Sequence, residues 1–251
     1  MKSFVKFAAV AVVSFASASS AVAAQTLPAA SDIVAKHVAA IGGKDAILKI
    51  TSMQHKGTME IPTMGLSATT EMSMAPNRMV SKSNLPGIGD IQQGFDGTTA
   101  WSTNPMQGPR IITDKELEQI KEQADFHTGL LYTPDRFLSM ETLGIVDFNN
   151  EKAYKVKFVR KGSNRETTEY FSVASGLQIG SETTQESEMG KMPVTIMLGE
   201  YKQFGPLKMP ARTEMTMGAN KLITTTQDVT FNTVPATAFE LPAQVKALVK
   251  P

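Results

Sequence analysis

Apolar and polar side chains alternate along most of the chain after residue 50, which is the two-residue period of β-strands. Between 53 and 61, Met53, Met59 and Ile61 fall on one face of the predicted strand. Between 69 and 74, Met72 and Met74 share a face while polar residues occupy the other. This alternation is typical of an antiparallel sheet with one apolar and one solvated face.

Turn signals divide the next part of the alternating region into short strands. The bends fall at residues 75–77, at 86–87 and at Asp96-Gly97. Asp-Gly predicts a type I′ hairpin turn, because both central residues of that turn have a positive φ. The block ends with Trp101, the only tryptophan, and with a break at Asn104-Pro105.

A helical period replaces the strand period in a few places. Residues 31–41 form one apolar face, with Ser31 or Asp32 as the expected N-cap and the glycines at 42–43 as the expected end. Residues 45–50 predict one more helical turn. Thr113 to Glu116 reads T-D-K-E, which predicts a capping box at the start of another helix. Pro134 suits a first helical position, so a short helix is expected over 133–140.

Strands resume at Ala153 and continue to Phe231, which makes about ten or eleven strands with two or three helices. No linker or low-complexity tract divides the chain. The predicted fold class is mainly β with α (α+β), as a single curved antiparallel sheet with helices on its concave face. A closed lipocalin-like barrel or a β-sandwich would explain the strand pattern nearly as well.

The N-terminus has the pattern of a secretory signal. Lys2 and Lys6 precede an apolar run from 7 to about 18, and residues 21–23 offer a small-x-small cleavage site. An ordinary N-terminal helix is the alternative. We therefore expect a signal peptide at 1–23, a single domain at 24–251, and export to the periplasm. Cysteine is absent, so neither a lipidation site nor a disulfide is expected, and no stable membrane anchor.

Charge and motifs exclude several function classes. The chain has 25 basic and 24 acidic residues, so no nucleic-acid partner is expected. The three histidines, His37, His55 and His127, lack zinc-ligand spacing, and neither a thiol nucleophile nor a G-x-S-x-G elbow is present. We expect no catalytic residue, no metal and no cofactor. A sugar-cleaving carboxylate pair stays open, because such pairs are defined in space rather than in sequence.

Ordered motifs in both halves of the chain resemble one family. The first half has P-N at 76–77, D-G at 96–97 and W-x-x-N-P at 101–105; the second has Y-K-V-K-F at 154–158 and Y-K-x-F-G-P-L-K-M-P at 201–210. This order resembles the LolA/LolB family of periplasmic lipoprotein carriers. The resemblance implies an unclosed half-barrel whose concave face is covered by helices, in a monomeric periplasmic protein.

Methionine supplies the candidate binding chemistry. The chain has 15 methionines, and several stand where the strand alternation points inward. Methionine is flexible and polarizable, so it suits a cavity for acyl chains, although on the residues alone a core that uses methionine as filler explains the pattern slightly better. The resemblance favours the cavity. The candidate lining residues are Met59, Met72, Met74, Phe95, Trp101, Leu117, Ile120, Phe158, Phe171, Met197, Met215 and Met217.

The expected function is therefore a carrier that holds a lipid or an acylated protein cargo, with transient envelope protein partners. The sequence departs from the family at Ala75, where the carriers have an arginine that helps to hold a lid closed. A sensor or protein-interaction module of the same fold is the alternative. A hydrolase with scattered carboxylates is a further one.

Overall fold

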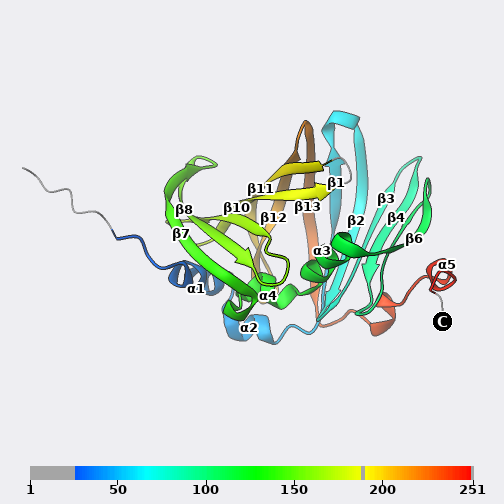
Figure 1. Ribbon diagram of the computed structural model, residues 1–251, viewed down its shortest axis with the longest axis horizontal. Coiled ribbons are helices and arrows are strands. Elements are labelled where there is room, and N and C mark those ends of the chain that lie inside the picture. The colour runs from blue at the N-terminus through cyan, green and yellow to red at the C-terminus, as the bar shows by residue number, and fades with distance from the viewer. Residues whose placement is uncertain (1–25, 188–189, 250–251) are drawn as a thin grey trace, which may run out of the picture.

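One antiparallel sheet contains all thirteen strands of the described residues (Figure 1). The computed structural model describes residues 26–187 and 190–249, and the predicted signal peptide at 1–23 lies outside this range. The strands of the first half are β1 (Met53–Ile61), β2 (Leu66–Ala75), β3 (Arg78–Leu85), β4 (Gly89–Phe95), β5 (Ala100–Asn104) and β6 (Gly108–Ile112). The strands of the second half are β7 (Phe137–Phe148), β8 (Glu151–Arg160), β9 (Glu166–Ser172), β10 (Gln178–Ser187), β11 (Gly190–Phe204), β12 (Leu207–Met217) and β13 (Asn220–Phe231).

The strand order is two meanders joined at the middle. It runs β6-β5-β4-β3-β2-β1-β13-β12-β11-β10-β9-β8-β7, so the first and last strands pair at the centre. Among the described residues β6 and β7 are the two edge strands, and they do not pair with each other, so the sheet is not closed. The predicted single curved sheet is confirmed, while the closed barrel, the sandwich and the count of ten or eleven strands are wrong.

Four helices pack on one face of the curved sheet (Figure 1). They are α1 (Ala30–Ala40), α2 (Lys44–Leu48), α3 (Asp114–Ala124) and α4 (Phe126–Leu131). On the opposite face lies the C-terminal segment, with a 3₁₀ turn at Ala236–Phe239 and α5 (Ala243–Lys246). The first two expected helices and the helix after residue 113 are therefore present.

The expected helix at 133–140 is wrong. Only a 3₁₀ turn at Pro134–Arg136 forms there, and strand β7 begins at Phe137. Proline fixes the start of a helical turn but not its length. Phe137 and Met140 pack against the same buried cluster as part of β7, so tertiary packing extends the chain as a strand.

Two local predictions gave the right element but the wrong stabilising contacts. The Asp96-Gly97 hairpin forms, but only Gly97 has a positive φ, and the Asp96 carboxylate accepts hydrogen bonds from the N–H groups of Thr98 and Thr99, both at 2.8 Å. The capping box at 113–116 does not form. Glu116 instead makes a two-pronged ion pair with Arg110, at 2.6 and 2.9 Å. Helix α1 likewise begins without a side-chain cap.

Candidate functional site

The cross-strand register defines which residues share the concave face at the centre of the sheet. Met72 on β2 lies opposite His55 on β1 and Ser81 on β3. Met59, four residues after His55, lies opposite Thr224 on β13. Partners in register point to the same side of a sheet, so these residues form one continuous surface.

Helices cover the two sides of this face. At one side, α1 contributes Ala30, Ile33 and Val34 to a buried cluster with Phe158 and Phe171 of β8 and β9. At the other, α3 packs on β3 to β6, with Ile120 and Ala124 against Met79, Phe95, Ala100 and Ile112. A third cluster lies between them under α2 and α4. The residues of these three clusters form the buried core on this face.

A hollow of about 210 Å³ remains on the central strands β13, β1, β2 and β3. The side chains that line it are two methionines, one histidine and a set of hydroxyls. They are His55, Met59, Thr70, Met72, Ser81, Ser83, Thr224 and Thr226, with Gly57 among them. Lys56 and Glu71 also border the hollow, but they alternate to the opposite face of their strands and pair with each other at 3.7 Å. The concave-facing lining therefore carries no charged side chain among the described residues.

Gly57 gives the hollow its floor. A Cβ at this position would lie 1.9 Å from the carbonyl oxygen of Thr225, so only glycine allows β1 to approach β13 this closely. The register shifts here, between Lys56 and Gly57. Because Gly57 lacks a side chain, no side chain stands between His55 and Met59 on this face of β1.

The sequence-predicted residues divide into those that line the hollow and those that do not. Met59 and Met72 line it. Met215 and Met217 face the same side from β12, two strands from β1. The other concave-facing candidates lie in the covered clusters: Phe95, Leu117, Ile120 and Met74 near α3, and Phe158 and Phe171 under α1.

Two of the predicted lining residues lie on the other face. Trp101 pairs with Gly94, one residue before the concave-facing Phe95, and is buried with Val80, Phe239 and Val245 under the C-terminal segment. Met197 lies next to Ile196, which pairs with the concave-facing Met215, so Met197 points the opposite way. The expectation for both residues is corrected, because each stands one position out of phase with the concave set.

Ala75 also lies on the outer face. It ends β2 and packs against the buried cluster that contains Trp101. An arginine at this position would therefore not face the helices on the concave side.

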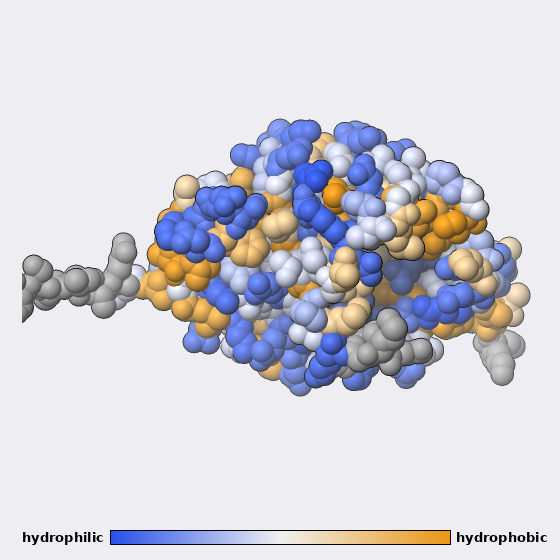
Figure 2. Space-filling model, turned by 90° about the horizontal axis from the view of Figure 1, so that it is seen from above, coloured by the Kyte–Doolittle hydropathy of each residue, from blue (hydrophilic) through white to orange (hydrophobic). Residues whose placement is uncertain are grey.

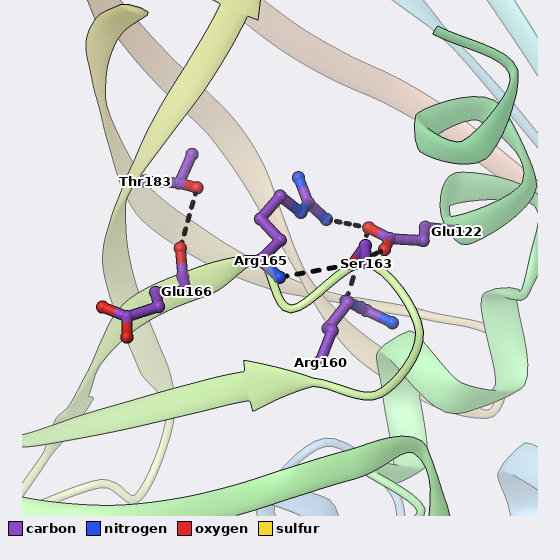
Figure 3. A network of polar contacts seen from close by, with 6 residues as sticks. All are labelled: Glu122, Arg160, Ser163, Arg165, Glu166 and Thr183. Carbon is purple, nitrogen blue, oxygen red and sulfur yellow. Dashed lines mark hydrogen bonds and ion pairs between the residues drawn. The ribbon is translucent and has the colours of Figure 1, made fainter. Parts of the chain in front are cut away.

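A charged network ties helix α3 to the opposite half of the sheet (Figure 3). The turn between β8 and β9 surrounds Glu122 of α3. The Arg165 guanidinium lies 2.5 Å from Glu122, Ser163 donates a hydrogen bond to it at 2.6 Å, and Arg160 lies 3.7 Å away. Since α3 packs on β3 to β6, this network bridges the two halves of the curved sheet.

Two larger cavities flank that network and have a different character. Their volumes are about 580 and 510 Å³. Both are lined by charged side chains of both signs, including Glu118 and Glu122 with Lys121 and Arg160 in the first. Burying a charge without a partner is costly, so these cavities suit an apolar chain less well than the uncharged central hollow does. Figure 2 shows hydrophilic and hydrophobic residues mixed over the face seen from above.

A second buried polar cluster lies beside α1. The Tyr132 hydroxyl donates to the Glu169 carboxylate at 2.5 Å, and the Gln178 amide donates to the same oxygen at 2.8 Å. Burial raises the pKa of Glu169 to about 7. Nearby, burial lowers the pKa of His37 to about 4, so its imidazole is neutral at neutral pH.

The described residues hold neither a cluster of metal ligands nor a membrane-spanning helix. They contain no group of three or more His, Asp or Glu side chains placed to hold a metal ion. Nor does the described part of the chain contain a helix long and apolar enough to cross a membrane.

Comparisons with known proteins place this architecture in a fold class. A DUF1329 family protein from Desulfovibrio piger matches with a TM-score of 0.60, 9% identity, and coverage of 86% of this chain and 97% of its own. A LolA superfamily protein from Nitrosomonas europaea matches at 0.58 and 13% identity, over 86% and 99%. A domain from Vibrio parahaemolyticus, described as an outer membrane lipoprotein-sorting protein, matches at 0.53 and 12% identity, over 83% and 95%. The chain therefore has a LolA-like fold.

Sequence comparison adds little to that result. No family model matches the chain. A segment is 32% identical to mouse alpha-2-antiplasmin over 101 residues, which is 35% of this chain. The match covers 21% of alpha-2-antiplasmin, so the chain spans about a fifth of the length of that curated relative.

Proposed function

We propose that this chain is a periplasmic binding protein that carries a hydrophobic ligand on the concave face of its sheet. The ligand is a lipid or the acyl chain of a lipoprotein, and residues 24–251 form the single domain that binds it. The observation that carries the proposal is the hollow on the central strands, whose concave-facing lining has no charged side chain and no helix residue within the described part of the chain, and which Met59 and Met72 line. The lipoprotein-sorting description of the Vibrio parahaemolyticus domain supports the same ligand class and compartment.

Burial of apolar surface provides the binding energy. Each methylene group contributes about 0.8 kcal/mol, so ten contribute roughly 8 kcal/mol before the costs of association. Methionine side chains adapt to different chains because they are unbranched and polarizable. No catalytic group is needed for this function.

The volume of the hollow implies movement of a helix when a long chain binds. At about 210 Å³ the hollow is smaller than the ~300–1,000 Å³ typical of sites for drug-sized ligands. A longer acyl chain extends along the concave face toward Met74 and the cluster that α3 covers. We therefore infer that α3 moves away from the sheet during uptake, and that the network around Glu122 resists this movement.

The test is a charge placed in the hollow. The double variant Met59→Glu/Met72→Glu and the single variant Met72→Glu are compared with Met197→Glu, which puts one carboxylate on the opposite face. Binding of the apolar fluorophore N-phenyl-1-naphthylamine should weaken at least tenfold in the double variant and stay within about twofold in the control, because buried carboxylates are costly. Equal binding by the wild-type protein and a double variant that keeps its β-sheet circular dichroism would exclude the hollow as the site.

A further inference from the structure

His55 is the one titratable side chain on the concave-facing lining of the hollow, within the described residues. It lies directly opposite Met72, and Gly57, which has no side chain, separates it from Met59 along β1. Its imidazole makes no hydrogen bond and no ion pair with any residue that the structure describes. A half-buried imidazole facing a hollow is therefore available to a ligand.

The hydroxyl groups around His55 are available in the same way. The side chains of Thr70, Ser81, Ser83 and Thr224 make no hydrogen bond with another described residue, although all four line the hollow. Hydroxyl groups both donate and accept hydrogen bonds, whereas the methionine side chains beside them offer apolar contact. The hollow thus combines an apolar surface with several polar groups that have no hydrogen-bond partner among the described residues.

The absence of charge from this lining restricts the ligand further. Burial lowers the pKa of His55 to about 4, so the imidazole is neutral at neutral pH. A carboxylate or phosphate bound here would lose its hydrating water and would find no cationic side chain on the concave-facing lining, so its binding would be costly. An uncharged ester or amide would lose less, and its carbonyl accepts a hydrogen bond from the imidazole N–H.

We propose that the hollow binds the end of an acyl chain that carries an uncharged ester or amide group, with His55 donating a hydrogen bond to its carbonyl oxygen. This inference rests on the proposed function and narrows its ligand class to acyl esters and amides in preference to free fatty acids. Met59 and Met72 contact the first methylenes of the chain, and the hydroxyls of β2 and β3 contact the polar group.

The experiment measures displacement of N-phenyl-1-naphthylamine from the exported protein at pH 7.4, with 1-monolauroylglycerol, N-lauroylglycinamide and laurate as competitors. All three carry the same chain, and only laurate is charged. The wild-type protein should bind the ester and the amide at least tenfold more tightly than laurate. Equal binding of all three would overturn the inference and leave the proposed function intact, whereas failure of all three to displace a bound fluorophore would reject both.

Variants of His55 test the role of the side chain. His55→Leu should lower affinity for the ester about tenfold, the value of one lost hydrogen bond, and leave affinity for laurate unchanged. His55→Gln retains an N–H donor and should restore ester binding to within about threefold of the wild type. Unchanged ester binding by folded His55→Leu would overturn the assignment, and the wild-type competition remains decisive if that variant does not fold.

Discussion

The part of the sheet under α1 and the centre of the sheet have the same alternating pattern, but the first forms buried core and the second borders an open hollow. Under α1, Phe158 and Phe171 are fully buried against the helix and against Tyr132, with ring centroids of Phe158 and Tyr132 5.4 Å apart. At the centre, Met59 and Met72 lie on the same face of the sheet, but they border an open hollow. The pattern of a strand therefore identifies a face, and the position of the helices decides whether that face becomes core or site.

The difference extends to the choice of side chains. The covered side uses rigid aromatic rings, which give specific contacts and large buried areas. The open centre uses flexible methionines and small hydroxyl residues, which adapt to a ligand. Stability and binding are thus expected to separate between the two regions.

The largest expected effect comes from a truncation under α1. Phe158→Ala should lower the free energy of unfolding by about 3–5 kcal/mol, because it leaves a cavity in a closed core. Met72→Ala should cost less than about 1.5 kcal/mol, because its side chain borders open space. Urea denaturation measures both values. Equal losses of unfolding free energy in the two variants would show that Met72 belongs to the structural core, which would contradict the distinction between the two regions.

A smaller effect is expected from the network that joins the two halves. Glu122→Gln weakens the contacts with Arg165 and Arg160 and should cost about 1–3 kcal/mol, because it leaves partly buried cations without their counter-charge. Hydrogen exchange in α3 should become faster, and fluorophore uptake should accelerate. Glu118→Gln is the control, since the ion pair of Glu118 with Lys121 is exposed. Unchanged exchange in α3 of the Glu122 variant would show that the network does not hold the helix.

The last expected effect is a dependence of stability on pH, and it lies on the covered side. The folded-state pKa of Glu169 is raised to about 7, so the folded protein binds this proton more tightly than the unfolded chain does. The stabilisation from this group is complete below the ordinary glutamate pKa and is lost as the pH rises toward and through 7. Glu169→Gln keeps an acceptor for Tyr132 and should flatten the dependence of stability on pH between 5 and 8. Denaturation at both pH values measures the slope, and equal slopes in the two proteins would contradict the assignment.

Local alternation and turn signals predicted most of the strands, whereas the choice of one open sheet over a barrel or a sandwich depended on the family resemblance. The strands around Met72 and Phe158, and the hairpin at Asp96-Gly97, follow directly from residue order. Phase was harder to assign, because Trp101 and Met197 stand one residue away from the concave set and nothing in composition shows which phase faces inward. The helix expected at 133–140 failed because packing of Phe137 overrode a local proline signal.

The site was less predictable than the fold. His55 stands in phase with Met53 and Met59, so its face could be read from the sequence, but its lack of a partner depends on three other strands. Glu122 and Arg165 lie 43 positions apart and meet only because α3 crosses toward the turn between β8 and β9. The order of strands at the centre, where β1 pairs with β13, brings together the two ends of the domain and creates the hollow.

The central claim is that an acyl ligand occupies the methionine-lined hollow at the centre of the sheet. Methyl-¹³C NMR of methionine-labelled protein tests it most directly, because every methionine gives a separate probe and substitution assigns each signal. On titration with 1-monolauroylglycerol, the methyl signals of Met59 and Met72 should shift with one common saturation curve, while that of Met197 on the opposite face stays in place. Saturable shifts at Met197 with none at Met59 and Met72 would contradict the account.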